Sequence, residues 1–128
     1  MSFNYNDLVK LRDNMIALEK RSDDFLRGFL LEMALRALAK TKQRTPVDTG
    51  TLRNNWFVGQ VRRKGDMLEV DIYNNIEYAS HVEYGHKTRS GGFKEGVFMC
   101  RLSIDEIQKE LPKRWERAFK SFISTLGF

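Results

Sequence analysis

The sequence predicts an α+β fold with N-terminal helices, a small antiparallel sheet with a central hairpin, and a C-terminal helix. Apolar residues recur every three or four positions over residues 1–44 and 96–128, as in amphipathic helices. Between these segments, residues 45–95 contain stretches in which apolar and polar side chains alternate, as in half-buried strands. A chain of 128 residues without an internal repeat is expected to form one domain spanning residues 1–128.

Residues 1–44 are expected to form a helical arm. Its first half carries a single apolar stripe with spacings of three and four, formed by Leu8, Leu11, Met15 and Leu18. Ser22 followed by Asp23 and Asp24 is typical of a helix start. We therefore favour two helices, residues 5–20 and 23–44, over one long helix with a bend. The stripe either packs within the domain or needs a partner, as in ring assemblies.

Residues 45–95 are expected to contain a turn, a hairpin and a mobile loop. Pro46 fixes φ, Asp48 can accept from backbone N–H groups, and Gly50 allows positive φ, so the segment after the arm is a rigid turn. Alternation over 56–62 and 67–73 around a Gly-containing loop predicts an antiparallel hairpin.

The end of this central region is less regular. Residues 76–84 fit either a helical turn or a short strand. Residues 86–95 are polar and rich in glycine, so we expect a mobile loop there.

The final segment, residues 96–128, is expected to be helical. Its apolar stripe is strong and consists of Leu111, Trp115, Phe119, Phe122 and Leu126. Pro112 interrupts this stripe and predicts a kink or a break.

Composition excludes several classes of protein. The single cysteine, Cys100, rules out an internal disulfide framework and a multi-cysteine metal cluster. No apolar run is long enough to span a membrane, and the N-terminus lacks the pattern of a secretory signal. The net charge of +5 is basic but is spread along the chain.

The candidates for catalysis and metal binding are weak. No nucleophile elbow, phosphate-binding loop or dinucleotide fingerprint is present. His81, Glu83 and His86 lie close in sequence, but they lack the helical spacing of a zinc site. Cys100 with a histidine could be written as a dyad, yet its position favours core packing. We therefore expect no enzyme activity and no catalytic, cofactor or metal site.

Nucleic-acid binding is a stronger candidate function than catalysis or metal binding. Basic residues gather at the expected hairpin tip and in the following loop: Arg62, Arg63, Lys64, Lys87, Arg89 and Lys94. They could contact phosphates, either as a binding module or as the rim of a channel that DNA traverses. Acidic residues interleave with them and no recognition helix is evident, so a solvated basic rim is favoured.

Two blocks of the sequence carry a family resemblance. The first block, residues 44–56, reads RTPVDTGTLRNNW, and the second block, residues 76–85, reads IEYASHVEYG. Together they resemble the small neck and tail-completion (head-tail joining) proteins of tailed bacteriophages, typified by the tenth gene product of a lambda-like coliphage. The matching residues are Thr45, Pro46, Asp48, Thr49, Gly50, Leu52, Arg53, Tyr78, Ala79, Glu83 and Gly85.

The resemblance implies a non-enzymatic structural role in the virion neck, after assembly in the host cytoplasm. It implies a ring, six-fold in the family, that contacts the head connector on one side and the tail terminator or tube on the other. DNA would pass through this ring without sequence-specific contacts, and no membrane or cofactor is implied.

The motif residues also allow predictions about packing. Leu52 and Trp56 should anchor the turn in the core, and an Arg53–Glu83 ion pair would draw the two blocks together. The motif either only specifies the fold or also contacts a neighbouring subunit, and the 86–95 loop would face DNA or a partner.

Overall fold

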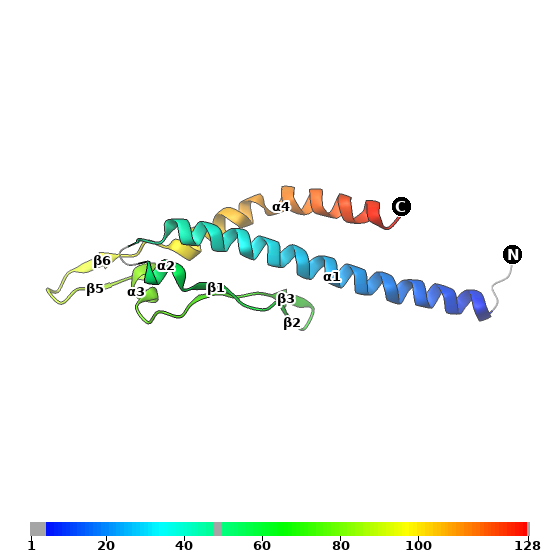
Figure 1. The fold of residues 1–128 in the computed structure, drawn as a ribbon, viewed down its shortest axis with the longest axis horizontal. Helices are drawn as coiled ribbons and strands as arrows, with labels where there is room; N and C mark the ends of the chain where they lie inside the picture. The colour runs from blue at the N-terminus through cyan, green and yellow to red at the C-terminus, as the bar shows by residue number, and fades with distance from the viewer. Residues whose placement is uncertain (1–4, 48–49, 128) are drawn as a thin grey trace.

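The computed structural model describes residues 5–47 and 50–127 and confirms the α+β class. The elements follow one another as α1 (Tyr5–Arg44), α2 (Thr51–Asn54), β1 (Trp56–Val58), β2 (Arg62–Lys64), β3 (Met67–Glu69), β4 (Ile72–Asn74), α3 (Ala79–Tyr84), β5 (Gly85–Lys87), β6 (Phe93–Glu95) and α4 (Met99–Thr125). The molecule is elongated, with α4 on one side of α1 and the β1–β4 hairpin on the other (Figure 1). No helix within the described ranges combines the length and apolar character needed to cross a membrane.

The first forty described residues of the helical arm form one helix, so the prediction of two helices is wrong. Asp23 does not cap a new helix. Its carboxylate accepts a hydrogen bond from Arg27 Nε at 2.7 Å, one turn further along, and pairs with Arg63 of the hairpin. These contacts, the Arg27 hydrogen bond above all, hold the pKa of Asp23 below its ordinary value. Asp23 is thus a mid-helix tether rather than a start signal.

Helix α4 packs antiparallel against the second half of α1. An aromatic cluster forms the far end of this contact, where the rings of Phe25 and Phe122 stack with centroids 4.4 Å apart. Trp115 packs against Phe25 and Phe29 in the same cluster. Pro112 lies inside α4, which continues through it, so the helix is not broken there. The ribbon bends about midway along α4, as expected from the hydrogen bond that proline cannot donate (Figure 1).

The central hairpin is confirmed. Its outer ladder pairs β1 with β4, from Trp56 opposite Asn74 to Val58 opposite Ile72. Its inner ladder pairs β2 with β3 around a turn that contains Gly65 with φ 61°. Arg27 of α1 donates to the carbonyl of Val61 at 3.3 Å, which fixes the hairpin to the helix.

Residues 76–84 match one of the two alternatives, whereas residues 86–95 differ from the expectation. The first part forms the short helix α3, which is the helical alternative. Residues 86–95 are not an unstructured loop, because β5 and β6 pair as a second hairpin. Its tip is closed by the Thr88 N–H, which donates to the Gly92 carbonyl at 2.8 Å, and by Gly91 with φ 89°. Backbone hydrogen bonds and glycine geometry form this hairpin without apolar alternation.

Candidate functional site

The two motif blocks meet at a corner where α1 ends. Thr45 Oγ1 accepts a hydrogen bond from Trp56 Nε1 at 2.9 Å and donates to the carbonyl of Thr41 at 2.7 Å. Trp56 is 5% exposed, and Leu52 of the following short helix is also buried. The predicted anchoring of the turn by Leu52 and Trp56 is confirmed. A buried threonine pair thus ties the helix end to the first strand.

The second block packs on the first. Ala79 of α3 and Met99 at the start of α4 complete a core cluster with Leu52 and Trp56. Asn74 joins the blocks through its side chain, donating to the Leu52 carbonyl at 2.9 Å and accepting from the Ile76 N–H at 2.8 Å. The role of Asn74 could not be anticipated from the sequence. An asparagine pair at the end of a strand indicates only a turn.

Glu83 caps helix α4. Its carboxylate is buried and accepts from the backbone N–H of Cys100 at 3.0 Å and of Arg101 at 2.9 Å. These N–H groups belong to the first turn of α4, where a helix has no internal acceptors and favours negative charge. The predicted Arg53–Glu83 pairing is wrong, because the Glu83 carboxylate is occupied by α4 and Arg53 is exposed.

The other motif residues have distinct positions. Gly50 precedes α2 with φ 83°, and Gly85 follows α3 with φ 89°, so both need the conformational freedom of glycine. Pro46 and Tyr78 are exposed, and Asp48 and Thr49 lie outside the described residues.

Gly96 lets the second hairpin return against α3, and we expect Gly96→Ala to destabilise the fold. A Cβ at this position would lie 2.3 Å from the Glu83 carbonyl oxygen and 2.6 Å from the Tyr84 carbonyl carbon. Because both are backbone atoms, we expect the free energy of unfolding to fall by about 1–3 kcal/mol in urea titrations.

Gly28→Ala is the matched control. Gly28 lies within α1 and its Cβ would meet nothing within 4 Å, so this change should raise the free energy of unfolding by about 0.5–1 kcal/mol. Equal stability of the two variants would contradict the close approach at Gly96.

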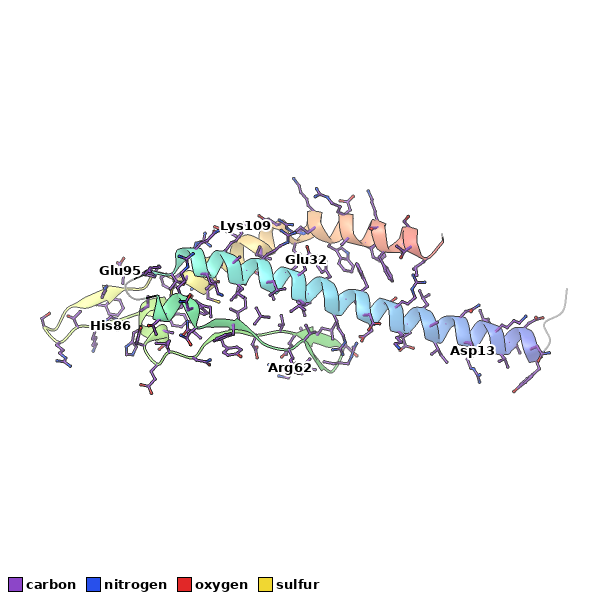
Figure 2. All side chains as sticks on the ribbon, viewed as in Figure 1. Asp13, Glu32, Arg62, His86, Glu95 and Lys109 are labelled. Carbon is purple, nitrogen blue, oxygen red and sulfur yellow. The ribbon has the colours of Figure 1, made fainter. Side chains whose placement is uncertain are left out.

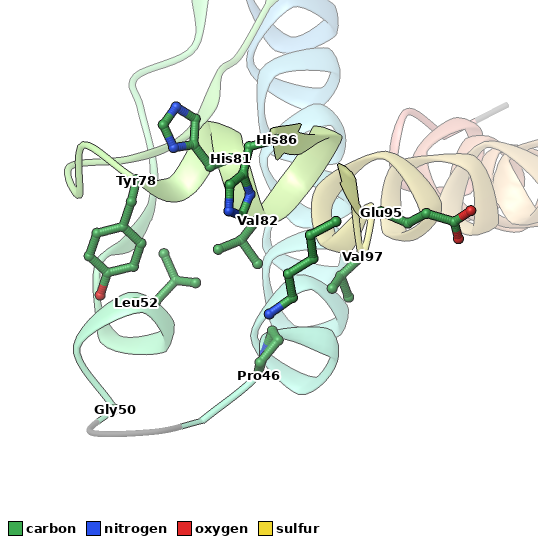
Figure 3. Close-up of a pocket in the computed structure, with 10 residues that line it drawn as sticks. Pro46, Gly50, Leu52, Tyr78, His81, Val82, His86, Glu95 and Val97 are labelled. Atoms are coloured by element: carbon green, nitrogen blue, oxygen red, sulfur yellow. The ribbon is translucent and has the colours of Figure 1, made fainter. Parts of the chain in front are cut away.

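A pocket of about 460 Å³ lies beside the corner (Figure 3). It is bordered by Leu52, Tyr78, Val82 and the two histidines, among others. The rings of His81 and His86 stack with centroids 5.4 Å apart, whereas the nearby Glu83 is bound to α4. The sequence-proximal set of His81, Glu83 and His86 is therefore not assembled around one point. No group of three or more metal-ligating side chains occurs among residues 5–47 and 50–127.

Cys100 lies half-buried at the start of α4. Burial, together with the charge of Glu83, raises the pKa of its thiol to about 11. The thiol is therefore protonated at neutral pH, whereas a reactive cysteine requires the thiolate.

The basic residues fall into two separate groups, one on each hairpin; Figure 2 labels Arg62 on the central hairpin and His86 on the second hairpin. Arg62 pairs with Glu69 and Asp71, and Arg63 pairs with Asp23. The two carboxylates, Asp71 first, raise the pKa of Arg62. The second hairpin carries Lys87, Arg89 and Lys94, which are exposed and form no ion pair within the described part of the chain. The two hairpin tips lie far apart, so the structure does not join these groups into one patch (Figure 1).

A charged network at the corner was not anticipated from the sequence. Glu106 of α4 accepts from Lys40 at 2.9 Å and pairs with Arg44, which also donates to Ser103 at 2.9 Å. The Arg44 and Lys40 hydrogen bonds hold the pKa of Glu106 below its ordinary value. Basic residues near a helix end indicate only a favourable contact with the helix dipole, because their acidic partner lies some sixty residues away in the sequence.

Comparison with known proteins decides the family. The family model described as "Bacteriophage HK97-gp10, putative tail-component" matches residues 10–85, which include both motif blocks. The chain belongs to this phage tail-component family. Searches of the curated proteins and of the solved structures found no significant match. Membership supports a structural role in the virion and contacts with other virion proteins.

Proposed function

We propose that this chain is a structural protein of the phage neck that completes the tail and joins it to the head. The match to a phage tail-component family over both motif blocks supports this role most strongly. Among neck proteins, the tenth gene product of a lambda-like coliphage is the type that the motif residues resemble. The protein would assemble in the host cytoplasm and remain in the virion.

The proposed mechanism is geometric. Six copies form a ring between the head connector and the tail terminator or tube, and DNA passes through it. The buried corner around Trp56 and Glu83 holds α1, the central hairpin and α4 at fixed angles, so that the hairpin tips reach neighbouring subunits or the channel. Subunits that present such loops on a rigid frame can build closed rings through heterologous contacts.

A non-enzymatic role is part of this proposal. The Cys100 thiol is protonated at neutral pH, and the Glu83 carboxylate serves as a helix cap. Cys100 and Glu83, the residues at the corner that could take part in catalysis, therefore have structural roles there. This arrangement supports a building block over a catalyst.

Deletion of the gene in the phage or prophage that encodes the chain tests the role. We expect DNA-filled heads and separate tails in electron micrographs, and joined particles when the purified chain is added to the lysate. Joined, infectious particles from the deletion would contradict the proposal.

The alternative function, a nucleic-acid-binding module, makes a different prediction. Two of the three basic residues at the central hairpin tip are already paired with carboxylates. We therefore expect the chain to bind a short DNA duplex weakly, and Arg62→Ala/Arg63→Ala/Lys64→Ala to change that binding little in fluorescence anisotropy titrations. The module would be favoured instead if the affinity for DNA fell with salt as steeply as several phosphate contacts require, and if the triple variant removed this dependence.

A further inference from the structure

Helix α1 extends beyond the rest of the fold at its N-terminal end (Figure 1). Helix α4 reaches back only to Arg21, whose guanidinium donates to the Thr125 carbonyl at 3.4 Å, and the central hairpin reaches Asp23. We call residues 5–20 the overhang. At 1.5 Å per residue it is about 24 Å long, and each side chain from residue 10 to residue 20 is exposed.

One face of the overhang is apolar. Its four large side chains are 54%, 49%, 62% and 38% exposed and belong to Leu8, Leu11, Met15 and Leu18. Their spacing of three, four and three is that of the a and d positions of a coiled coil. We call these four residues the seam. With Ser22 as the next a position, the same repeat leads to Phe25 and Phe29, which α4 covers.

We propose that a second copy of this chain covers the seam, with its own overhang running antiparallel to the first. This direction is the one in which α4 already packs on α1. The second copy's Tyr5 then lies beside Arg21, where α4 ends, and its helix occupies the uncovered length. Leu8 faces Leu18 of the second copy, and Leu11 faces Met15, so each of the four layers is apolar.

Length fits this pairing, and so does the charge at its two ends. Each overhang is as long as the surface that it must cover, so the contact closes on itself about a two-fold axis. The same register places Asp7 near Arg21 of the second copy at both ends of the contact. Because a two-fold contact does not extend into a ring, the pair is a form of the free protein, and it does not depend on the proposed neck function.

Sedimentation velocity of the full chain over a range of concentrations tests the pairing. We expect a reversible monomer–dimer equilibrium. Met15→Lys should weaken the dimer by at least about 10-fold, because each copy then places a charge in the apolar seam. Ile16→Lys is the matched control: Ile16 is 57% exposed but lies off the seam, so the dimer should persist within about twofold of its original affinity.

Cross-linking tests the orientation. Asn14 flanks the two-fold axis in the antiparallel register, so Asn14→Cys should form a disulfide-linked dimer on mild oxidation. Leu11→Cys should not, since two copies of residue 11 meet only in a parallel pair. The native chain, whose Cys100 is half-buried, is the control for unrelated disulfides.

Three results would overturn the inference. The first is a chain that stays monomeric at every concentration. This result also counts against the pairing if another tail protein, once added, covers the seam. The second is a dimer that Met15→Lys leaves intact, with the variant's circular dichroism melt unchanged. The third is efficient cross-linking through Leu11→Cys. None of these results bears on the deletion phenotype, so the two proposals can fail separately.

Discussion

Trp56→Ala is expected to lower the free energy of unfolding by about 3–5 kcal/mol, the range for removing a large buried aromatic side chain. Trp56 is 5% exposed and lies in one core cluster with Leu52, Ala79 and Met99. Its indole N–H also donates to Thr45 Oγ1, which links the end of α1 to β1. Urea denaturation followed by circular dichroism measures the loss.

Two other substitutions separate the contributions at this position. Trp56→Phe keeps an aromatic ring but removes the hydrogen bond to Thr45, so we expect an intermediate loss of about 1–2 kcal/mol. Phe57→Ala changes the next residue, which is 39% exposed on the opposite face of the strand and packs against Tyr73. It should reduce stability by less than about 1 kcal/mol. A loss at Trp56→Ala no greater than that at Phe57→Ala would show that the corner does not depend on the indole.

The parts of the fold that follow a regular period could be predicted from the sequence. The central hairpin alternates over two stretches, and the aromatic stripe of the last helix repeats at helical spacing, so both were anticipated. The second hairpin was missed because its strands have three residues each and Phe93 is the one large apolar side chain among them, so no alternation is visible. Its formation depends on glycine geometry and on chain reversal against α3, which a periodicity argument does not detect.

The single helix α1 shows how tertiary contacts override a local signal. Ser22, Asp23 and Asp24 have the composition of a helix start, and nothing nearby in sequence contradicts that interpretation. The contacts that decide otherwise come from Arg63 and from α4, which lie far along the chain. A helix interior tolerates such residues when its carboxylates find cationic partners.

The candidate site was predictable in position but not in its bonding. The family resemblance located both motif blocks, and the structure brings them together at one corner. The partners of Glu83 could not be deduced, because they are backbone N–H groups of a helix whose start lies sixteen residues downstream. Every residue except proline has a backbone N–H group, so the sequence does not indicate which of them binds a carboxylate. A cationic side chain such as Arg53 is identified by its residue type, and it therefore led to the incorrect prediction of an Arg53–Glu83 pair.

The cap itself leads to the second large prediction: Glu83→Ala should lower the free energy of unfolding by about 3 kcal/mol. The substitution leaves the N–H groups of Cys100 and Arg101 without their acceptor at a buried helix end. Hydrogen bonds to a charged group contribute about 1.5–3 kcal/mol each, and the losses overlap because one carboxylate makes them all. Urea denaturation gives the total, and amide hydrogen exchange should show faster exchange at these two residues first.

Two variants distinguish a cap from a general loss of charge. Glu77→Ala removes an exposed carboxylate from the same block, so its effect should stay within about 0.5 kcal/mol. Glu83→Gln retains one acceptor oxygen but turns an amide toward the helix N–H groups, and it should therefore lose roughly half as much stability as Glu83→Ala. If Glu83→Gln and Glu83→Ala both unfold like the native chain while amide exchange at Cys100 and Arg101 is unchanged, the carboxylate does not hold α4 at the corner. Other contacts would then have to hold α1, the central hairpin and α4 in the fixed arrangement on which the neck proposal depends.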